Sequence, residues 1–216
     1  MRDIPPVTLA LLIANVAVFL LQQVLGPMLI ANFALWPLGG PGYARTAQGI
    51  VEISFMPWQL VTYGFLHGGT FHLVMNCFAL YMFGGSIERT LGSRPFVIYY
   101  ATCVVGAALL QLATMGVQPP QGMTPTVGAS GGVYGLLLAF GMLFPRQIIM
   151  LLIPPIPMPA WLFVTLFGAI ELFQGLSRAQ SPIAHFAHLG GMLAGFVLLQ
   201  YWRGKLPIKP KRRLTL

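Results

Sequence analysis

Residues 128–144 read GASGGVYGLLLAFGMLF, a stretch without any charged side chain. A hydrocarbon core of about 30 Å takes roughly 20 helical residues, so this stretch is nearly long enough to cross a bilayer. It nevertheless carries Ser130 and Tyr134 in its first turns. Polar groups inside a spanning helix are rare and by default functional, because lipid cannot solvate them. The stretch therefore predicts a membrane helix with a functional serine near one end.

The composition extends this prediction to the whole chain. Its 216 residues are 56% hydrophobic and 7% charged, which leaves too little polar surface to coat a soluble domain. We predict an all-α membrane protein, a single bundle of six transmembrane helices. The expected spans are residues 7–26, 70–87, 95–115, 128–144, 160–177 and 183–202. The first is longer than the apolar part of a signal peptide, so we expect it to remain in the protein.

The distribution of basic residues predicts the orientation. Of the 12 lysines and arginines, all but Arg45 and Arg178 fall on the side of the two termini. Cytoplasmic loops are enriched in these residues, so both termini are expected in the cytoplasm. We expect the basic tail, residues 203–216, to bind anionic lipid headgroups rather than nucleic acid. No mitochondrial targeting segment is apparent, which by elimination favours a bacterial plasma membrane.

Three of the predicted spans run in the same direction, from outside to inside. Their first turns therefore lie at one depth near the outer face, where a water-filled cavity could reach them. Those turns carry three pairs of polar residues, which are His72 with Asn76, Ser130 with Tyr134, and His185 with His188. The sequence thus places a possible nucleophile and possible bases in one layer.

Helical spacing indicates how two of these turns approach each other. His188, Gly191 and Gly195 follow the i, i+3, i+7 pattern, so the histidine shares a face with two residues that lack a side chain. Small residues at such positions let membrane helices pack closely. The span of Ser130 carries glycines of its own at Gly131, Gly132 and Gly135. We therefore expect the Ser130 hydroxyl and the His188 imidazole to reach hydrogen-bonding distance, as nucleophilic catalysis requires.

The start of the helix at Ser130 also predicts an oxyanion site. Helix N-termini have unpaired N–H groups and a partial positive charge, so the amides of Ala129 and Ser130 are candidate donors. His72 and Asn76, four residues apart, add side-chain donors from one face of the second span.

None of the four acidic residues is expected to orient His188. Asp3 and Glu52 lie outside the predicted spans, Glu88 is at the other end of the second span, and Glu171 is deep in the fifth. We therefore predict a Ser–His dyad without a carboxylate, and a structural role for Glu171, with a gate or proton-handling role as the weaker alternative.

Together these residues resemble the rhomboid family of intramembrane serine proteases. The resemblance covers most of the chain and rests on the order and spacing of several motifs. These are Gly128-Ala129-Ser130-Gly131, Tyr134, His72 with Asn76, Ala187-His188-Leu189-Gly190-Gly191 with Gly195, and the stretch GGSIERTLGS at residues 84–93. One departure is that Arg45 follows Ala44, where the family has a Trp-Arg pair.

The resemblance implies a serine endopeptidase that cuts transmembrane segments of other proteins within the bilayer. Ser130 would be the nucleophile and His188 the general base and acid, with Tyr134 packed on the His188 ring. His72, Asn76 and the backbone near Ser130 would form the oxyanion hole. The fifth span would act as a lateral gate, and no metal or cofactor is implied.

Other interpretations remain open from the sequence alone. A metal- or haem-binding membrane protein could use the four histidines, His67, His72, His185 and His188. A non-catalytic relative could bind membrane clients without cutting them. Within the protease hypothesis, His185 lies one turn from His188 on the same face and competes with it as the base.

Overall fold

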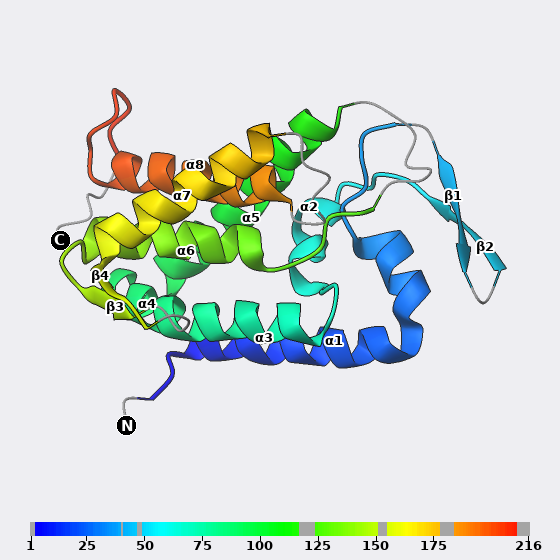
Figure 1. Ribbon diagram of the computed structural model, residues 1–216, viewed down its shortest axis with the longest axis horizontal. Helices are drawn as coiled ribbons and strands as arrows, with labels where there is room; N and C mark the ends of the chain where they lie inside the picture. The colour runs from blue at the N-terminus through cyan, green and yellow to red at the C-terminus, as the bar shows by residue number, and fades with distance from the viewer. Residues whose placement is uncertain are drawn as a thin grey trace.

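The computed structural model describes residues 3–39, 41–46, 49–116, 124–150, 155–177 and 184–210. Arg2, Arg178 and residues 211–216 of the predicted tail therefore lie outside the described part of the chain. The described chain forms a bundle of long helices, with a β-hairpin projecting from one end (Figure 1).

Helices occupy all six ranges where the sequence predicts spans. They are α1 (Pro6–Phe33), the continuous segment Thr70–Leu91, α5 (Ser93–Met115), α6 (Ser130–Leu143), α7 (Ala160–Leu176) and α8 (His185–Trp202). The segment Thr70–Leu91 comprises α3 (Thr70–Ala79), a π-helical turn η2 (Leu80–Gly84) and α4 (Gly85–Leu91). Two short helices, α2 (Gln59–Thr62) and η1 (Tyr63–Phe65), precede it.

The surface of this bundle is suited to lipid. Among the described helices, three are long and apolar enough to cross a membrane, and α6 and α7 are shorter apolar helices. Large apolar side chains face outward, for example Leu20, Phe71 and Phe173, which are 61%, 79% and 74% exposed. An outer face of this kind is stable in a bilayer and not in water. The predicted class, an all-α membrane bundle, is confirmed.

The centre of the bundle is formed by α5, α6 and α8, which pack on one another through glycines. A methyl group added to Gly191 would overlap the carbonyl oxygen of Gly131, and one added to Gly106 would overlap the side chain of Ala194. The Tyr99 hydroxyl donates a 2.7 Å hydrogen bond to the carbonyl of Gly135. The close approach that the glycine spacing predicts is therefore present, and it brings the backbones of α6 and α8 into contact.

Helix α1 is longer than predicted. The expected end of the first span is residue 26, but the helix continues through Pro27 to Phe33 and turns sharply toward its end (Figure 1). Proline removes one backbone hydrogen bond and bends a helix, but the chain can continue helically beyond it. The loop that follows contains the hairpin of β1 (Gly42–Thr46) and β2 (Gly49–Ile53). A second pair, β3 (Ile148–Met150) with β4 (Pro157–Pro159), joins α6 to α7.

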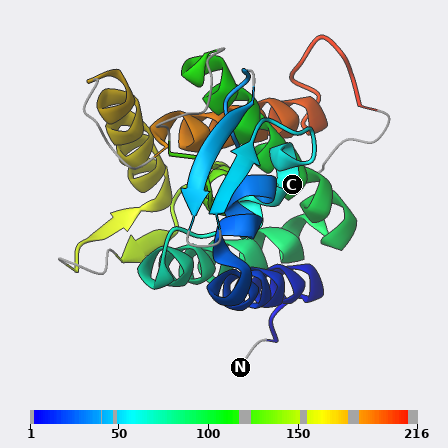
Figure 2. The ribbon, with the colours of Figure 1, turned by 90° about the vertical axis from the view of Figure 1, so that its right-hand side faces the viewer.

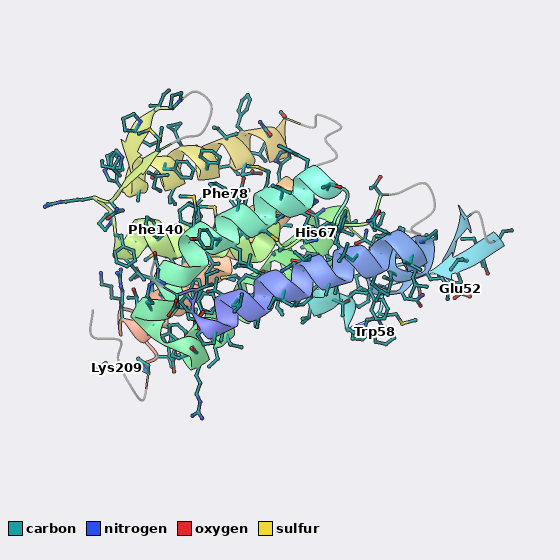
Figure 3. The ribbon with its side chains drawn as sticks, turned by 90° about the horizontal axis from the view of Figure 1, so that it is seen from below. Glu52, Trp58, His67, Phe78, Phe140 and Lys209 are labelled. Carbon is teal, nitrogen blue, oxygen red and sulfur yellow. The ribbon has the colours of Figure 1, made fainter. Side chains whose placement is uncertain are left out.

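The two ends of the bundle differ in what they carry. Figure 3 shows Glu52, on the hairpin, and Lys209, in the C-terminal segment, at opposite ends of the molecule. At the Lys209 end, the buried Glu88 carboxylate accepts the backbone N–H groups of Val7 at 3.0 Å and Thr8 at 2.7 Å. The hydroxyls of Thr8 and Ser93 donate to the same carboxylate at 2.7 and 2.8 Å. Glu88 thus caps α1, which has no capping side chain of its own.

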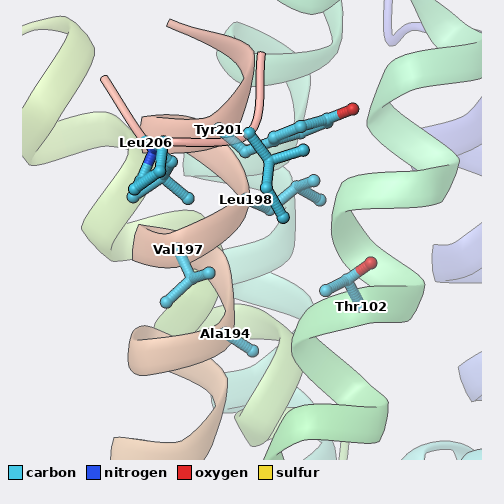
Figure 4. Close-up of a pocket in the computed structure, with 8 residues that line it drawn as sticks. Thr102, Ala194, Val197, Leu198, Tyr201 and Leu206 are labelled. Carbon is cyan, nitrogen blue, oxygen red and sulfur yellow. The ribbon is translucent and has the colours of Figure 1, made fainter. Parts of the chain in front are cut away.

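A groove of about 600 Å³ lies between α5 and α8 (Figure 4). Its lining is apolar apart from the Thr102 and Tyr201 hydroxyls, and it includes Ala194 and Ile208. None of the predicted site residues lines it, so the candidate chemistry lies elsewhere.

Candidate active site

Ser130 and His188 meet where α6 and α8 cross. Ser130 is the first residue of α6, and His188 lies in the first turn of α8. The Ser130 Oγ and the His188 Nε2 are 2.8 Å apart. His188 is buried, while Ser130 is partly exposed. A hydroxyl at this distance from an imidazole nitrogen can transfer its proton to that nitrogen.

Tyr134 fixes the plane of the His188 ring. The two rings are stacked, with centroids 4.1 Å apart and an angle of 6° between their planes. Tyr134 lies one turn after Ser130 on the same helix, so one face of α6 presents both the hydroxyl and the stacking surface. The ring can therefore rotate little about its stacked position.

His72 lies beside Gly128, two residues before Ser130. Gly128 has a φ of +127°, and a Cβ there would be 2.7 Å from His72 Cε1 and 2.9 Å from His72 Nε2. Only glycine combines this backbone conformation with room for the ring. The same Cβ position is 3.6 Å from Ser130 Oγ, so the ring edge is close to the serine.

The tautomer of His72 follows from its other nitrogen. The Gly68 N–H donates to His72 Nδ1 at 3.3 Å. A neutral ring that accepts at Nδ1 carries its proton on Nε2, the atom next to Gly128. His72 therefore presents an N–H donor toward the space beside Ser130.

Asn76 contributes less directly. Its side-chain amide donates to the carbonyl of His72 at 2.9 Å, within α3. The described part of the chain shows no contact between Asn76 and Ser130. The structure thus brings His72 to the serine and leaves Asn76 one turn deeper, where it is buried.

A carboxylate lies beside His188, contrary to the prediction from the sequence. Glu171 of α7 is 6% exposed, and its Oε2 lies 3.0 Å from His188 Nδ1. The Nδ1 atom is off the line of a hydrogen bond to this oxygen. The same Oε2 contacts His185 Nδ1 at 2.6 Å, and Oε1 accepts the Tyr134 hydroxyl at 2.5 Å.

The expectation that no acidic residue lies close enough to assist His188 is wrong because of the direction of α7. This helix runs antiparallel to α8, so its last turns lie beside the first turn of α8. Alternating spans already place residue 171 at the depth of residues 185–188, but the face of α7 that carries Glu171 is set by packing.

Comparison with known protein families agrees with this geometry. The family model of the rhomboid domain matches residues 54–204, which include every residue of the site. The chain belongs to the rhomboid family.

Rhomboid relatives occur in mitochondria and bacteria. The chain is 30% identical over 188 residues to "Rhomboid protein 1, mitochondrial" of Saccharomyces cerevisiae, covering 85% of this chain and 53% of the relative. For "RHOMBOID-like protein 12, mitochondrial" of Arabidopsis thaliana the identity is 29%, over 86% of this chain and 55% of the relative. "Rhomboid protease GlpG" of Yersinia pseudotuberculosis is 24% identical, over 91% and 62%. The chain thus spans between half and two thirds of these relatives' length.

The four histidines of this rhomboid protein do not form one ligand set. His67 and His72 contact each other with ring centroids 5.2 Å apart, and His185 and His188 form a separate pair. In the described residues, the group that could offer three ligand atoms to one metal ion is Glu171, His185 and His188. Within this group the 2.6 Å contact between His185 Nδ1 and Glu171 Oε2 is a hydrogen bond.

His185 is not the histidine that contacts Ser130. It is buried and directs its Nδ1 to Glu171. Of the two candidates for the base, the geometry favours His188.

Proposed function

We propose that this rhomboid protein is an intramembrane serine endopeptidase that cleaves transmembrane segments of other proteins. The observation that carries the proposal is the 2.8 Å contact between Ser130 Oγ and His188 Nε2. Both residues lie at the crossing of two helices in a bundle whose outer face is apolar, so a substrate would arrive from lipid.

In the proposed reaction Ser130 Oγ attacks the scissile carbonyl carbon while His188 Nε2 takes the hydroxyl proton. The peptide C–N bond then breaks, and His188 returns the proton to the leaving amine. Water attacks the resulting ester with His188 again as the base, which releases the new carboxyl group and restores Ser130.

The carbonyl oxygen becomes negatively charged during the attack. The Nε2–H of His72 and the backbone N–H of Ser130 at the start of α6 are the donors best placed to stabilise it, with Ala129 and Asn76 as further candidates. Each well-aimed donor of this kind commonly contributes about 3 kcal/mol.

A regular helix hides its carbonyls from attack, so the substrate segment must be locally unwound by glycine, proline or other weak helix formers. Helix α7 lies at the edge of the bundle and packs on α6 and α8 (Figure 2), which suits a lateral entrance. In this proposal both termini are cytoplasmic, the site is near the outer face, and the basic tail meets anionic lipid. A bacterial plasma membrane is the proposed location.

Labelling with a fluorophosphonate probe tests the proposal directly, because this reagent phosphonylates only activated serines. The detergent-purified protein should be labelled, and Ser130→Ala and His188→Ala should both abolish the labelling. Ser177→Ala, which changes an exposed serine at the end of α7, is the matched control and should label normally. A folded wild-type protein that fails to label and fails to cleave a transmembrane reporter would refute the proposal.

A further inference from the structure

Glu171 has no role in the Ser130–His188 chemistry as described above, yet it is the most highly connected side chain of the site. Its two oxygens contact Tyr134, His185 and His188. We propose that Glu171 is a positioning residue that holds His188 in its reactive orientation and stabilises its protonated form. This inference rests on the proposed protease function and adds a third member to the Ser–His pair.

The burial of Glu171 needs an explanation. An acidic side chain in a membrane helix is costly and is normally retained for a function, facing the bundle interior and pairing with another group. Glu171 is 6% exposed and faces α6 and α8 from α7. Its partners are all side chains of the candidate active site, so the function it serves is most simply that of the site.

The first link from Glu171 to His188 passes through Tyr134. The carboxylate accepts the Tyr134 hydroxyl at 2.5 Å, and the Tyr134 ring is stacked on the His188 ring. The hydroxyl bond fixes the rotation of the tyrosine, and the stacked face then fixes the plane of the imidazole. Without the carboxylate, the tyrosine hydroxyl would lose the acceptor that Glu171 provides.

The second link is electrostatic. When Nε2 of His188 accepts the serine proton, the ring becomes positively charged with its Nδ1 3.0 Å from Glu171 Oε2. A carboxylate at this distance stabilises the imidazolium and favours the tautomer that has its proton on Nδ1. The misalignment of this contact makes the effect smaller than in a straight hydrogen bond.

His185 completes the arrangement by orienting the carboxylate. Its Nδ1 is 2.6 Å from Glu171 Oε2, the oxygen that faces His188. His185 lies on the same helix as His188 and holds this oxygen in place. The polar groups around His188 are therefore Ser130 and Tyr134 on α6, Glu171 on α7, and His185 on α8, with His72 on α3 beyond the serine.

The test compares Glu171→Gln with the wild type in two assays. Glutamine keeps the size and an acceptor for Tyr134 but removes the charge. We expect the rate of fluorophosphonate labelling and the kcat for a transmembrane reporter to fall on the order of 10- to 100-fold, with KM within about twofold. This loss is below the roughly 10⁴-fold effect of removing a well-aligned triad carboxylate.

Glu88→Gln is the matched control, since Glu88 is the other buried glutamate of the bundle. It should lower the thermal stability and leave the labelling rate of the folded protein unchanged. Tyr134→Phe keeps the stacked ring and removes the hydroxyl, and we expect a smaller loss of roughly 3- to 10-fold. Because Glu171→Gln removes the charge and keeps an acceptor for Tyr134, the two variants break separate links, and the double variant Glu171→Gln/Tyr134→Phe should be slower than Glu171→Gln alone.

Several outcomes would overturn the inference. A Glu171→Gln protein that is less stable but labels at the wild-type rate would show a structural role only. If that variant does not fold, wild-type kinetics in Tyr134→Phe would have the same meaning. Either result leaves the proposed function intact, whereas failure of the wild type to label would refute the proposed function itself.

Discussion

Two glutamates are buried at opposite ends of this bundle, and their partners are of different kinds. Helix α4, which carries Glu88, lies far from the first turn of α8 (Figure 1). Glu88 binds backbone N–H groups and hydroxyls, none of which changes charge near neutral pH. Glu171 binds a tyrosine and two histidines. Fixed donors make a carboxylate a cap, whereas the titrating partners of Glu171 are those that the proposed proton transfer requires.

The largest effect should come from the site end. Ser130→Ala and His188→Ala should each lower cleavage of a transmembrane reporter by at least about 1,000-fold, because they remove the nucleophile or the base. His185→Ala should retain at least about a tenth of the activity, since His185 touches Glu171 and not Ser130. An inactive His185→Ala protein beside an active His188→Ala protein would reverse the assignment of the base.

The next effect concerns the oxyanion donor. Gly128→Ala would place a Cβ 2.7 Å from His72 Cε1 at a backbone φ of +127°. The ring must move away from Ser130, and we expect activity to fall roughly 100-fold, as when one oxyanion donor is lost. Single-turnover kinetics measure this directly. A Gly116→Ala control changes a glycine that also has positive φ but an open surrounding. Equal losses in both variants would point to backbone strain alone.

At the other end of the bundle, substitution of Glu88 should lower the thermal stability of the protein. Glu88→Gln removes the charge from a carboxylate that accepts bonds from α1 and from Ser93, and hydrogen bonds to charged groups contribute about 1.5–3 kcal/mol each. We expect the thermal midpoint in detergent to fall by roughly 5 °C. The exposed Glu52→Gln on β2 serves as the control and should not shift it. A Glu88→Gln protein with normal thermal stability but slow cleavage would contradict the structural role of Glu88 and with it the difference from Glu171.

We expect acid to lower the stability of the fold through protonation of His67. This residue lies just before α3, at the end of the bundle that carries the candidate site (Figure 3). Burial lowers the pKa of His67 from 6.5 to about 4, and the nearby His72 adds to this shift. Between these pH values the unfolded chain binds more protons than the folded one, so stability is full above pH 6.5 and declines as the pH falls toward 4.

His67→Gln tests this assignment by thermal unfolding at several pH values. The variant should lose less stability than the wild type between pH 6.5 and 4, since it cannot take up the proton. An identical pH dependence in both proteins would show that other groups control acid sensitivity.

The sequence predicted what depends on one helix at a time. The length of the apolar segments identified the membrane bundle. Each segment must be long and apolar enough to cross the lipid by itself, so this property can be read one segment at a time. The glycines that follow Ser130 and His188 predicted the contact of α6 with α8, because a residue without a side chain lets another backbone come close.

Only the tertiary structure decided which residues of different helices lie next to each other. Glu171 is close to His188 because α7 is rotated so that its last turns face α6 and α8, and no local pattern in the chain encodes this rotation. The continuation of α1 beyond Pro27 likewise depends on packing, since proline weakens a helix without ending it. The sequence thus predicted the proposed nucleophile and base and determined the lipid environment, and the packing of α7 decided which carboxylate lies beside His188.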